Sequence, residues 1–412
     1  MTTLSPPVVY DPYSAAFKAD PWPVYRLLRD KAPVYVSEKW GFHALSRFDD
    51  VRAAARDHET FLSFEGIDID DTAKDMSAPG FLPDIDNPRH DQLRRIVQRT
   101  FLPRTIAKLE DDVRRVVTGL VDRFADAGEA DIAQDLSWPI PYAVFFDVLG
   151  LPTTGSDRAD LERWSHGLKD RENDDPRLTP VAWDALHNTK DYLAEILMER
   201  RRNPREDLLS TLVTAAVDDH GGAPFAPPVI DRHSEIVGLA FVLFMAGVES
   251  TAALLSTAFR ELAQNPDQRR MLLADPSLIP AAVEEALRFD APLQVAGRTT
   301  TRDVHLHDTT IRAGERVFLI YGSANRDDRQ YEDPDRFDVT RPQRRHMSFS
   351  EGLHGCLGAP LARLEARVAL EVALPRLGDY TISGPMHLYR STPNMRVLDH
   401  LPISFTPTGR TT

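Results

Sequence analysis

Cys356 is the only thiol in the 412-residue chain. It lies in the segment Phe349-Ser-Glu-Gly-Leu-His-Gly-Cys-Leu-Gly358, which leads into a predicted helix with Pro360 near its start. Backbone N–H groups at a helix N-terminus stabilise negative charge, so this position favours the thiolate, the form of cysteine that binds metals. A lone cysteine without such a context is more often a buried apolar residue. The neighbouring residues therefore decide between these two interpretations.

Glycines at positions 352, 355 and 358 punctuate this segment. They allow tight turns and a close approach of the backbone to a flat ligand, while Phe349 can shield the sulfur. The spacing Phe-x-x-Gly-x-x-x-Cys-x-Gly resembles the haem-binding signature of the cytochromes P450 at every fixed position. The resemblance implies that Cys356 binds the iron of haem b (iron protoporphyrin IX), with Phe349 and Gly358 beside the cofactor. A thiolate ligand of this kind favours cleavage of the O–O bond.

A second group of residues with chemical potential is Ala246-Gly247-Val-Glu249-Ser250-Thr251, inside a long apolar segment. Glycine in a helix interior costs about 1 kcal/mol relative to alanine, so Gly247 needs a packing or ligand reason, and room for dioxygen is one. Activation of dioxygen consumes two protons, which a carboxylate and a hydroxyl can relay. Alternatively, these side chains only satisfy neighbouring backbone groups.

The family pattern has an acid followed by threonine here, whereas this chain has Glu249 followed by Ser250. Serine keeps the hydroxyl but lacks the methyl group that restricts χ1. Because position along the helix decides which side chain faces the iron, we predict that Ser250 rather than Thr251 carries the proton. The resemblance makes Gly247, Glu249, Ser250 and Thr251 the candidate catalytic residues.

Four basic side chains match family positions that contact the haem propionates. His90 and Arg94 stand at i and i+4 on one helix face, Arg298 follows a glycine, and His354 precedes the cysteine by two residues. From the residues alone, the first pair is equally consistent with a solvated helix start. Cationic and imidazole N–H groups suit carboxylates at a pocket edge. The resemblance implies that all four bind the cofactor.

Glu285 and Arg288 are spaced i and i+3 at the end of a predicted helix, and Arg341 follows further on. Alone, such a pair is a weak signal, because Glu/Arg pairs are common on protein surfaces. The resemblance implies that the three form a Glu-Arg-Arg network with a structural role and no chemistry.

These residues need a scaffold, and apolar periodicity predicts that it is mainly helical. Helices are predicted over residues 22–31, 48–57, 90–101, 105–127, 182–201, 207–217, 228–263, 266–274, 279–289 and 360–374. Strand signals pair 34–36 with 42–45 and 304–306 with 310–311, cover 316–321, and form a C-terminal pair near Leu388 and Ile403. No repeat or linker divides the chain, so we expect one domain over residues 1–412. The resemblance implies the cytochrome P450 fold, mainly α with small β-sheets around a buried haem.

Composition limits the partners and the compartment. Lys and Arg total 49 and Asp and Glu total 63, a net charge of −14, and no long basic tract is present, which argues against nucleic acid. One cysteine allows no internal disulfide, and the N-terminus has no signal-peptide pattern, so the cytoplasm is expected. The apolar stretch 236–259 contains Glu249 and several hydroxyls, which favours a buried helix over a membrane span. We expect a soluble monomer.

The substrate pocket is assigned by position in the family pattern. Its walls are expected from loop 64–82, from region 164–174, and from Ala246, Leu293, Val295, Asn394 and Met395. These mixed residues suit a compact, partly oxygenated molecule such as a phenolic ether, a terpenoid, or a polyketide or macrolide intermediate. The acids Asp68, Asp70 and Asp71 favour a neutral or cationic ligand unless they face solvent.

The resemblance implies a monooxygenase that inserts one oxygen atom from O₂ by hydroxylation or oxidative O-demethylation. Electrons would come from a ferredoxin or flavodoxin that docks on the cysteine side, where Arg344, Arg345 and Arg363 supply positive charge, although these residues equally suit a solubilising role. One alternative is a peroxygenase that uses H₂O₂. The replacement of the family's acid-threonine pair by Glu249-Ser250 suggests this alternative. Another is a non-catalytic haem-binding protein, against which Gly247 and Glu249 argue.

Overall fold

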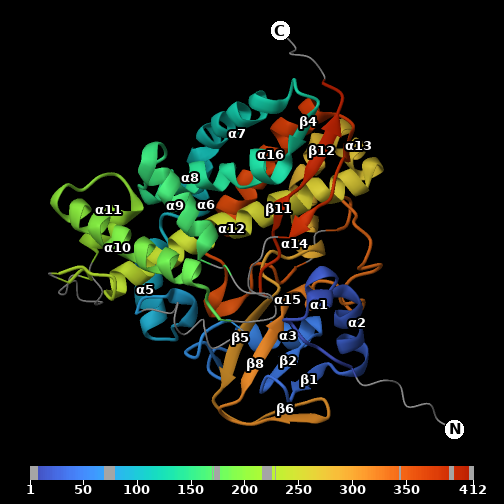
Figure 1. Cartoon of the computed structure of the whole chain (residues 1–412). Coiled ribbons are helices and arrows are strands. Elements are labelled where there is room, and N and C mark those ends of the chain that lie inside the picture. The colour runs from blue at the N-terminus through green and yellow to red at the C-terminus, as the bar shows by residue number, and fades with distance from the viewer. Residues whose placement is uncertain are drawn as a thin grey trace.

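The computed structural model describes residues 8–68, 79–168, 170, 177–215, 225–227, 229–342, 345–388 and 394–407. Asp70, Asp71 and Arg344, three charges singled out from the sequence, lie outside these residues. Figure 1 shows a large helical body beside a smaller part that carries the main sheet. The prediction of a mainly helical fold with small sheets is confirmed.

The helices account for most of the described chain. The α-helices are α1 (Ala15–Ala19), α2 (Trp22–Lys31), α3 (Phe48–Arg56), α5 (Arg89–Val97), α6 (Pro103–Ile106), α7 (Glu110–Phe124), α8 (Pro139–Leu149), α9 (Gly155–Gly167), α10 (Pro180–Arg202), α11 (Leu208–Thr214), α12 (Glu235–Gln264), α13 (Pro266–Ala274), α14 (Ile279–Phe289), α15 (Tyr321–Ala324) and α16 (Ala359–Leu377). Short 3₁₀ turns η1 (Leu82–Asp84), η2 (Ala107–Leu109), η4 (Pro276–Leu278) and η5 (Gly352–His354), and a π-helical turn η3 (Ala133–Ser137), connect them.

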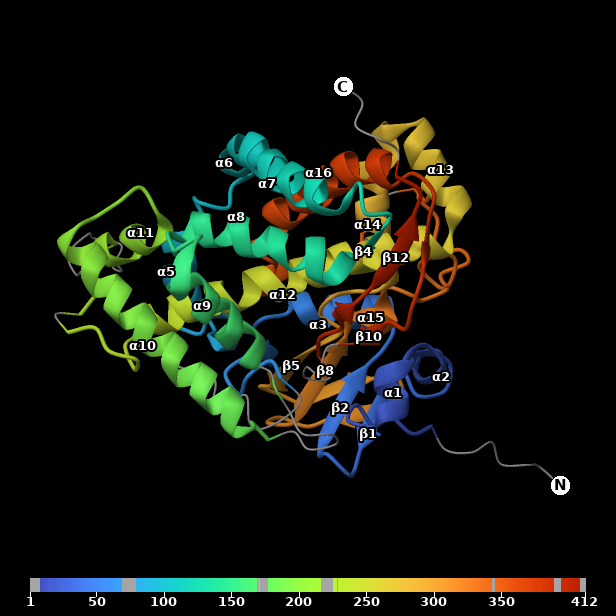
Figure 2. The same ribbon diagram turned by 45° about the horizontal axis from the view of Figure 1, so that its top comes forward.

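Helix α12 is the central helix of the body and crosses its middle in Figure 2. It packs against α8, α10, α14 and α16. It begins at Glu235 rather than near residue 228, because the Ser234 hydroxyl bonds with Asp231 in a preceding turn and Ser234 takes the N-cap position. Among the described residues it is the one helix apolar and long enough to cross a membrane, but 78% of its apolar window is buried in the protein. It is therefore a core helix.

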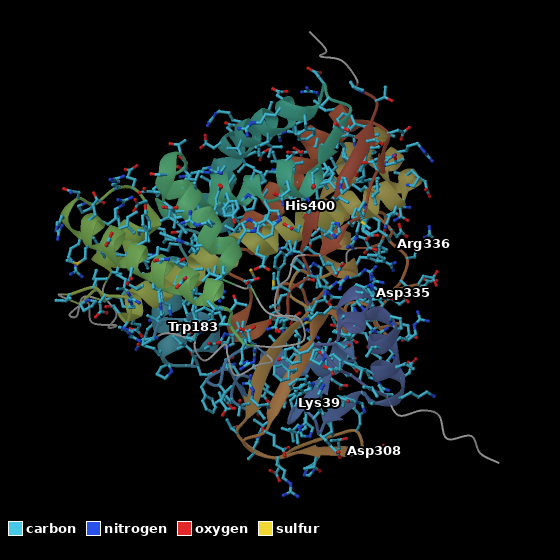
Figure 3. All side chains as sticks on the ribbon, in the orientation of Figure 1. Lys39, Trp183, Asp308, Asp335, Arg336 and His400 are labelled. Atoms are coloured by element: carbon cyan, nitrogen blue, oxygen red, sulfur yellow. The ribbon has the colours of Figure 1, made fainter. Side chains whose placement is uncertain are left out.

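The main sheet has five strands in the order β1-β2-β8-β5-β3. They are β1 (Val34–Ser37), β2 (Phe42–Leu45), β8 (Arg316–Ile320), β5 (Val295–Thr300) and β3 (Phe61–Leu62). Only the β2–β8 pairing is parallel among these, and it joins residues 42–45 to residues 316–319, which are far apart in the chain. In Figure 3, Lys39 and Asp308 lie at this sheet-rich end, whereas Trp183 lies on the helical side.

Three small sheets complete the described structure. Strand β6 (Val304–Leu306) pairs with β7 (Thr309–Ile311), β10 (His387–Leu388) with β11 (Leu398–His400), and β12 (Pro402–Phe405) with both β4 (Glu129–Asp131) and β9 (Tyr380–Ile382). The predicted pairing of Leu388 with Ile403 is wrong. Leu388 lies opposite Leu398, and Ile403 lies between Ile382 and Ala130.

Helices α8 and α9 were not predicted from the sequence. Helix α8 is apolar on nearly all sides, with buried residues that follow no single stripe, so helical periodicity is absent from its sequence. Gly150 ends α8 in the left-handed region at φ 89°. The predicted helix over 105–127 is divided into α6, η2 and α7.

Glu285, Arg288 and Arg341 meet in the interior at the end of α14. The Arg288 guanidinium donates two hydrogen bonds of 2.7 Å to the two Glu285 carboxylate oxygens, and Arg341 Nε donates to Glu285 Oε1 at 3.2 Å. Arg288 also donates to the carbonyls of Asn325 and Pro334, both at 2.9 Å. The network ties α14 to the irregular segment that precedes the cysteine loop.

We predict that Glu285→Ala lowers the free energy of unfolding by about 3–5 kcal/mol, because it leaves the Arg288 charge buried and unpaired. Urea unfolding of the purified protein, followed by tryptophan fluorescence, measures this loss. Asp112→Ala removes an exposed partner of Arg115 at the same i, i+3 spacing and should cost under about 1 kcal/mol. Equal losses in the two variants would contradict the prediction.

Candidate active site

The cysteine loop is fixed by backbone contacts. The Cys356 N–H donates to the Phe349 carbonyl at 2.8 Å, and α16 begins three residues after the cysteine. Gly352 has φ +73°, and an added Cβ would lie 2.8 Å from the Ala55 carbonyl oxygen, so only glycine fits there. Together these contacts leave the backbone at Cys356 little freedom to move.

The environment of the thiol acts on its charge in two directions. Burial raises the pKa of Cys356, whereas the backbone N–H groups of Gly358 and Ala359 and the nearby charge of Arg94 and Arg363 lower it. The Cys356 side chain is nevertheless accessible, because it lines an internal cavity. A thiolate at this position would be stabilised by oriented N–H groups rather than by a proton donor.

Phe349 accepts the backbone hydrogen bond of Cys356 and lines the same cavity. It is partly buried against the main apolar core, and the Arg363 guanidinium stacks 4.5 Å above its ring. This contact ties the start of the cysteine loop to α16.

An internal cavity of about 330 Å³ joins the cysteine loop to α12, a size typical of small-molecule sites. The α12 wall consists mainly of Val242, Leu243 and the stretch from Met245 to Thr251 except Val248, and the opposite wall contains Cys356, Leu357 and Gly358. Most of the surface of the cavity is apolar. The structure therefore brings the two predicted chemical motifs, which are about a hundred positions apart in the sequence, to one cavity.

The four predicted basic residues also line this cavity. The rings of His90 and His354 lie 4.7 Å apart, edge to face. Arg94 donates from its two terminal nitrogens to the carbonyls of Leu353 at 3.3 Å and Gly355 at 2.7 Å. Arg94 thus holds the cysteine loop by two hydrogen bonds and also places a positive charge at the edge of the cavity.

Burial controls the charge of the two imidazoles. It lowers the pKa of His90 to about 4 and also lowers the pKa of His354. His354 Nε2 lies 3.1 Å from the Ser63 hydroxyl and 3.9 Å from the Asp86 carboxylate, which opposes the effect of burial. Arg298 on β5 is 2% exposed and donates to the adjacent Gly297 carbonyl at 2.6 Å. Three helical or strand elements therefore direct N–H donors to one end of the cavity.

The α12 stretch gives Gly247 a packing reason. An added Cβ at Gly247 would lie 2.4 Å from Cε1 of Phe145 on α8, so glycine lets that ring pack against the helix. The sequence predicted a packing or ligand reason for this glycine; the contact with Phe145 is a packing reason, and Gly247 also lines the cavity.

The hydroxyls of Ser250 and Thr251 on α12 make similar hydrogen bonds but differ in burial. Ser250 Oγ donates to the Ala246 carbonyl at 2.7 Å and is partly exposed, whereas Thr251 Oγ1 donates to the Gly247 carbonyl at 3.2 Å and is 4% exposed. Glu249 is buried at 6% exposure. All three line the cavity.

His166 on α9 is a neighbour of the cavity acid that the sequence did not suggest. Its ring lies 4.4 Å from Trp138 and 5.9 Å from Tyr142. Burial lowers the pKa of His166, while the charges of Asp399 and Glu249 raise it. A titratable ring therefore lies within electrostatic reach of both the cavity acid and a surface acid.

Four of the five single residues predicted for the substrate pocket line the cavity, and one does not. Ala246, Leu293, Asn394 and Met395 line the cavity, but Val295 does not. Val295 packs in a separate core with Phe318 and Ile320, because alternate residues of β5 face opposite sides and Ala296 and Arg298 take the cavity side.

The two predicted loops contribute in part. Ile67, Asp68, Phe81 and Leu82 line the cavity, whereas Phe64 is 59% exposed and does not. Trp164 packs on the main core outside the cavity, and residues 69–78, 169 and 171–176 lie outside the described residues.

Several wall residues were missed, and their positions explain why. The most prominent are Phe101, Phe145, Val242, Leu254, Ala296 and Tyr321. Strand alternation beside Arg298 could have identified Ala296. The others come from elements whose mutual arrangement is not a local property of the sequence.

These features define the class of protein. A basic donor set suits two carboxylates, and an added Cβ at Gly358, beside Cys356, would meet no other atom within 4 Å, so a flat group can approach the backbone there. The residues fit an iron macrocycle that carries carboxylates and takes Cys356 as its protein ligand. The site is that of a haem-thiolate protein.

Comparisons with known proteins identify the family. A profile of the cytochrome P450 family matches residues 41–377. The putative cytochrome P450 123 of Mycobacterium tuberculosis is 36% identical over 97% of each chain, and the cytochrome P450 monooxygenase PikC of Streptomyces venezuelae is 34% identical over 98% of this chain and 95% of its own. The structure of cytochrome P450 CYP109Q5 from Chondromyces apiculatus superimposes with a TM-score of 0.83 at 34% identity, over 97% of this chain and 98% of the other.

The chain belongs to the cytochrome P450 family. It is a haem-thiolate monooxygenase whose cofactor is haem b, and its partners include a small organic substrate and dioxygen.

A further acid lies on α16, beyond the cysteine. Glu365 is 1% exposed, and no hydrogen bond from the described chain reaches either carboxylate oxygen. Burial raises the pKa of Glu365 to about 8. The carboxyl group is therefore mostly protonated at neutral pH in the folded protein and ionised in the unfolded chain.

We predict that Glu365 makes the folded state less stable as pH rises from about 4.5 to 8. In that range the folded protein holds a proton that the unfolded chain releases, so the free energy of unfolding falls, by roughly 5 kcal/mol in total. Glu365→Gln should remove this loss, so the variant gains stability over wild type as pH rises. Urea unfolding of both proteins at several pH values measures the difference.

Glu371→Gln removes a partly exposed, ion-paired acid from the same helix and serves as the matched control. A constant difference between wild type and Glu365→Gln across this range would show that Glu365 is ionised in the folded protein.

Proposed function

We propose that the protein hydroxylates or oxidatively O-demethylates a small organic molecule. The single observation that supports this is the shared cavity, whose walls contain both Cys356 and the Glu249-Ser250 pair. When bound, the haem supplies reductive activation of dioxygen. The side chains of this protein supply the position, the dry surroundings and the protons.

In this proposal the basic residues and the loop hold the cofactor. His90, Arg94, Arg298 and His354 bind its carboxylates at the donor-rich end of the cavity, and Cys356 is the iron ligand. Phe349 excludes water from the sulfur, and Gly358 leaves space for the flat face. The two hydrogen bonds from Arg94 to the loop carbonyls support this role, because they link carboxylate binding to the position of the cysteine.

Ser250 Oγ is the proposed site of proton transfer in the cavity. It donates to the Ala246 carbonyl at 2.7 Å and keeps two acceptor lone pairs, so it can accept one proton while releasing another. Glu249, its buried neighbour in the cavity wall, supplies the next proton to Ser250.

Electrons would come from a separate ferredoxin or flavodoxin. On the cysteine side, Arg52, Arg56 and Arg345 all pair with the single carboxylate of Glu351, which leaves an excess of positive charge. Arg363 instead pairs with Glu284 at 2.6 Å. An acidic partner protein complements this surface. Burial of α12 within the body supports a soluble enzyme, and we propose that it acts as a monomer in the cytoplasm.

We predict that Cys356→Ser abolishes the thiolate-type Soret band of the reduced, CO-bound protein, because a serine hydroxyl cannot supply a sulfur ligand. The absorbance spectrum of wild type and variant at equal haem content measures the change. A thiolate-type band in the variant would overturn the assignment of Cys356.

We predict that Ser250→Ala lowers the product formed per reductant consumed several-fold, and by more than Thr251→Ala does. Loss of the Ser250 hydroxyl interrupts proton delivery, whereas the more buried Thr251 hydroxyl only satisfies a backbone carbonyl. Parallel assays of reductant consumption and product measure this coupling. Equal coupling in the two variants would overturn the assignment of proton transfer to Ser250. Turnover with H₂O₂ alone would favour a peroxygenase.

A further inference from the structure

One ion pair beside the cysteine loop has no part in the proposed reaction. Glu284 on α14 accepts hydrogen bonds from Arg363 Nε at 2.6 Å and from Arg363 Nη2 at 2.9 Å, so both carboxylate oxygens are used. Arg363 belongs to α16, the helix that begins three residues after Cys356, and α14 packs against α16 (Figure 2). The pair therefore joins the helix that follows the thiol to a neighbouring helix.

A third group, His346, adds to the hydrogen bonds that this acid accepts. Glu284 Oε2 accepts from His346 Nε2 at 3.1 Å, and His346 is 8% exposed. The Ser348 N–H donates to His346 Nδ1 at 3.3 Å, so Nδ1 carries no hydrogen and Nε2 is the donor. Burial of Glu284 opposes its ionisation, but the hydrogen bonds from Arg363 and His346 lower its pKa to about 2. Glu284 is therefore negatively charged at neutral pH.

The cation of the pair is held on an aromatic ring of the cysteine loop. The Arg363 guanidinium lies 4.5 Å from the centre of the Phe349 ring, and the Phe349 carbonyl accepts the Cys356 N–H at 2.8 Å. An arginine over the face of such a ring is attracted by the ring quadrupole. Ser348 fixes the backbone before the ring, because its hydroxyl accepts from Asn325 Nδ2 at 2.8 Å. The positive charge of Arg363 thus has a defined place beside the loop.

Two cations influence the charge of the thiol. Burial raises the pKa of Cys356, and the charges of Arg94 and Arg363 add to the backbone N–H groups that lower it. The proposed function assigns Arg94 to the cofactor carboxylates, which balance its charge. The charge of Arg363 is balanced by Glu284 instead. Their side chains are 43% and 23% exposed, so water weakens the effect of the pair on the sulfur without removing it.

We infer that the Glu284–Arg363 pair sets how readily the iron accepts an electron when the cofactor is bound. Arg363 places a positive charge beside the sulfur ligand, which favours the reduced state because reduction adds a negative charge. Glu284 is the positioning residue that holds Arg363 on the Phe349 ring and balances part of its charge. The inference rests on the proposed function for the iron ligand, and it gives Arg363 a role other than docking of a redox partner.

The test measures the reduction potential of the iron in the holoenzyme, by spectroelectrochemical titration with dithionite and dye mediators and without a partner protein. Glu284→Gln keeps an acceptor for Arg363 but removes the negative charge. It should raise the equilibrium constant for one-electron reduction at least about threefold, which is about 28 mV at 59 mV per tenfold change.

Arg363→Gln tests the opposite charge. It removes the positive charge and leaves Glu284 ionised, so it should lower the same equilibrium constant by a similar factor. The double variant should lie between the two single variants, because it removes one charge of each sign. Shifts of the same sign in both single variants would overturn the inference, because they would indicate a disturbed structure rather than an effect of charge.

A docking role for Arg363 gives a different result. It would change the affinity for an acidic partner protein but not a potential that is measured without one. Unchanged potentials in both single variants would therefore overturn the inference and favour docking.

Glu110→Gln is the matched control, because Glu110 pairs in the same way with Arg367, one turn further along α16, at 2.7 Å. It should leave the potential unchanged, and a shift as large as that of Glu284→Gln would overturn the inference. A wild-type holoenzyme without a thiolate-type Soret band would show that the proposed function has failed. A holoenzyme with the band and with the same potential in every variant would show that only the present inference has failed.

Discussion

The position of one backbone segment governs the rest of this structure. A thiolate that is a metal ligand must remain at one point inside the protein, and the cysteine loop is fixed there from three directions. The Cys356 N–H bonds to Phe349, Gly352 packs against the carbonyl of Ala55 where no side chain fits, and Arg94 reaches two further loop carbonyls. Helix α16 then begins at once and supplies the N–H groups that face the sulfur. Elements from the N-terminal third of the chain are therefore needed to place a ligand near its C-terminal end.

Local chemistry in the sequence was sufficient to find much of the site. The cysteine loop and the Gly247-to-Thr251 stretch are short motifs, the four basic residues stand at recognisable positions, and residues from all three groups line one cavity. Helices with a clear apolar stripe were also predicted well, and α13 and α14 match their predicted ranges. These features depend on neighbours in the sequence, which is why the sequence reveals them.

Features that depend on distant contacts were not predictable. Val295 was placed in the pocket by its position in the family pattern, but the register of β5 turns its side chain into another core. Helix α8 lacks a stripe because it is buried nearly all round, and β10 and β12 have different partners from those expected. The environment of Glu365 and the pairing of Glu284 with Arg363 likewise arise from packing between segments that the sequence does not show to be adjacent.

The hydrogen bonds of Arg94 to the cysteine loop also bear on how the protein is made in the cell. They span 259 and 261 positions of the chain. At roughly 5–20 residues per second, a ribosome needs about 10–50 s to add that length after α5 has emerged. During that time the basic and apolar residues of the future cavity have no cysteine loop to enclose them. The cavity that holds the cofactor is therefore complete only after the cysteine loop has been synthesised.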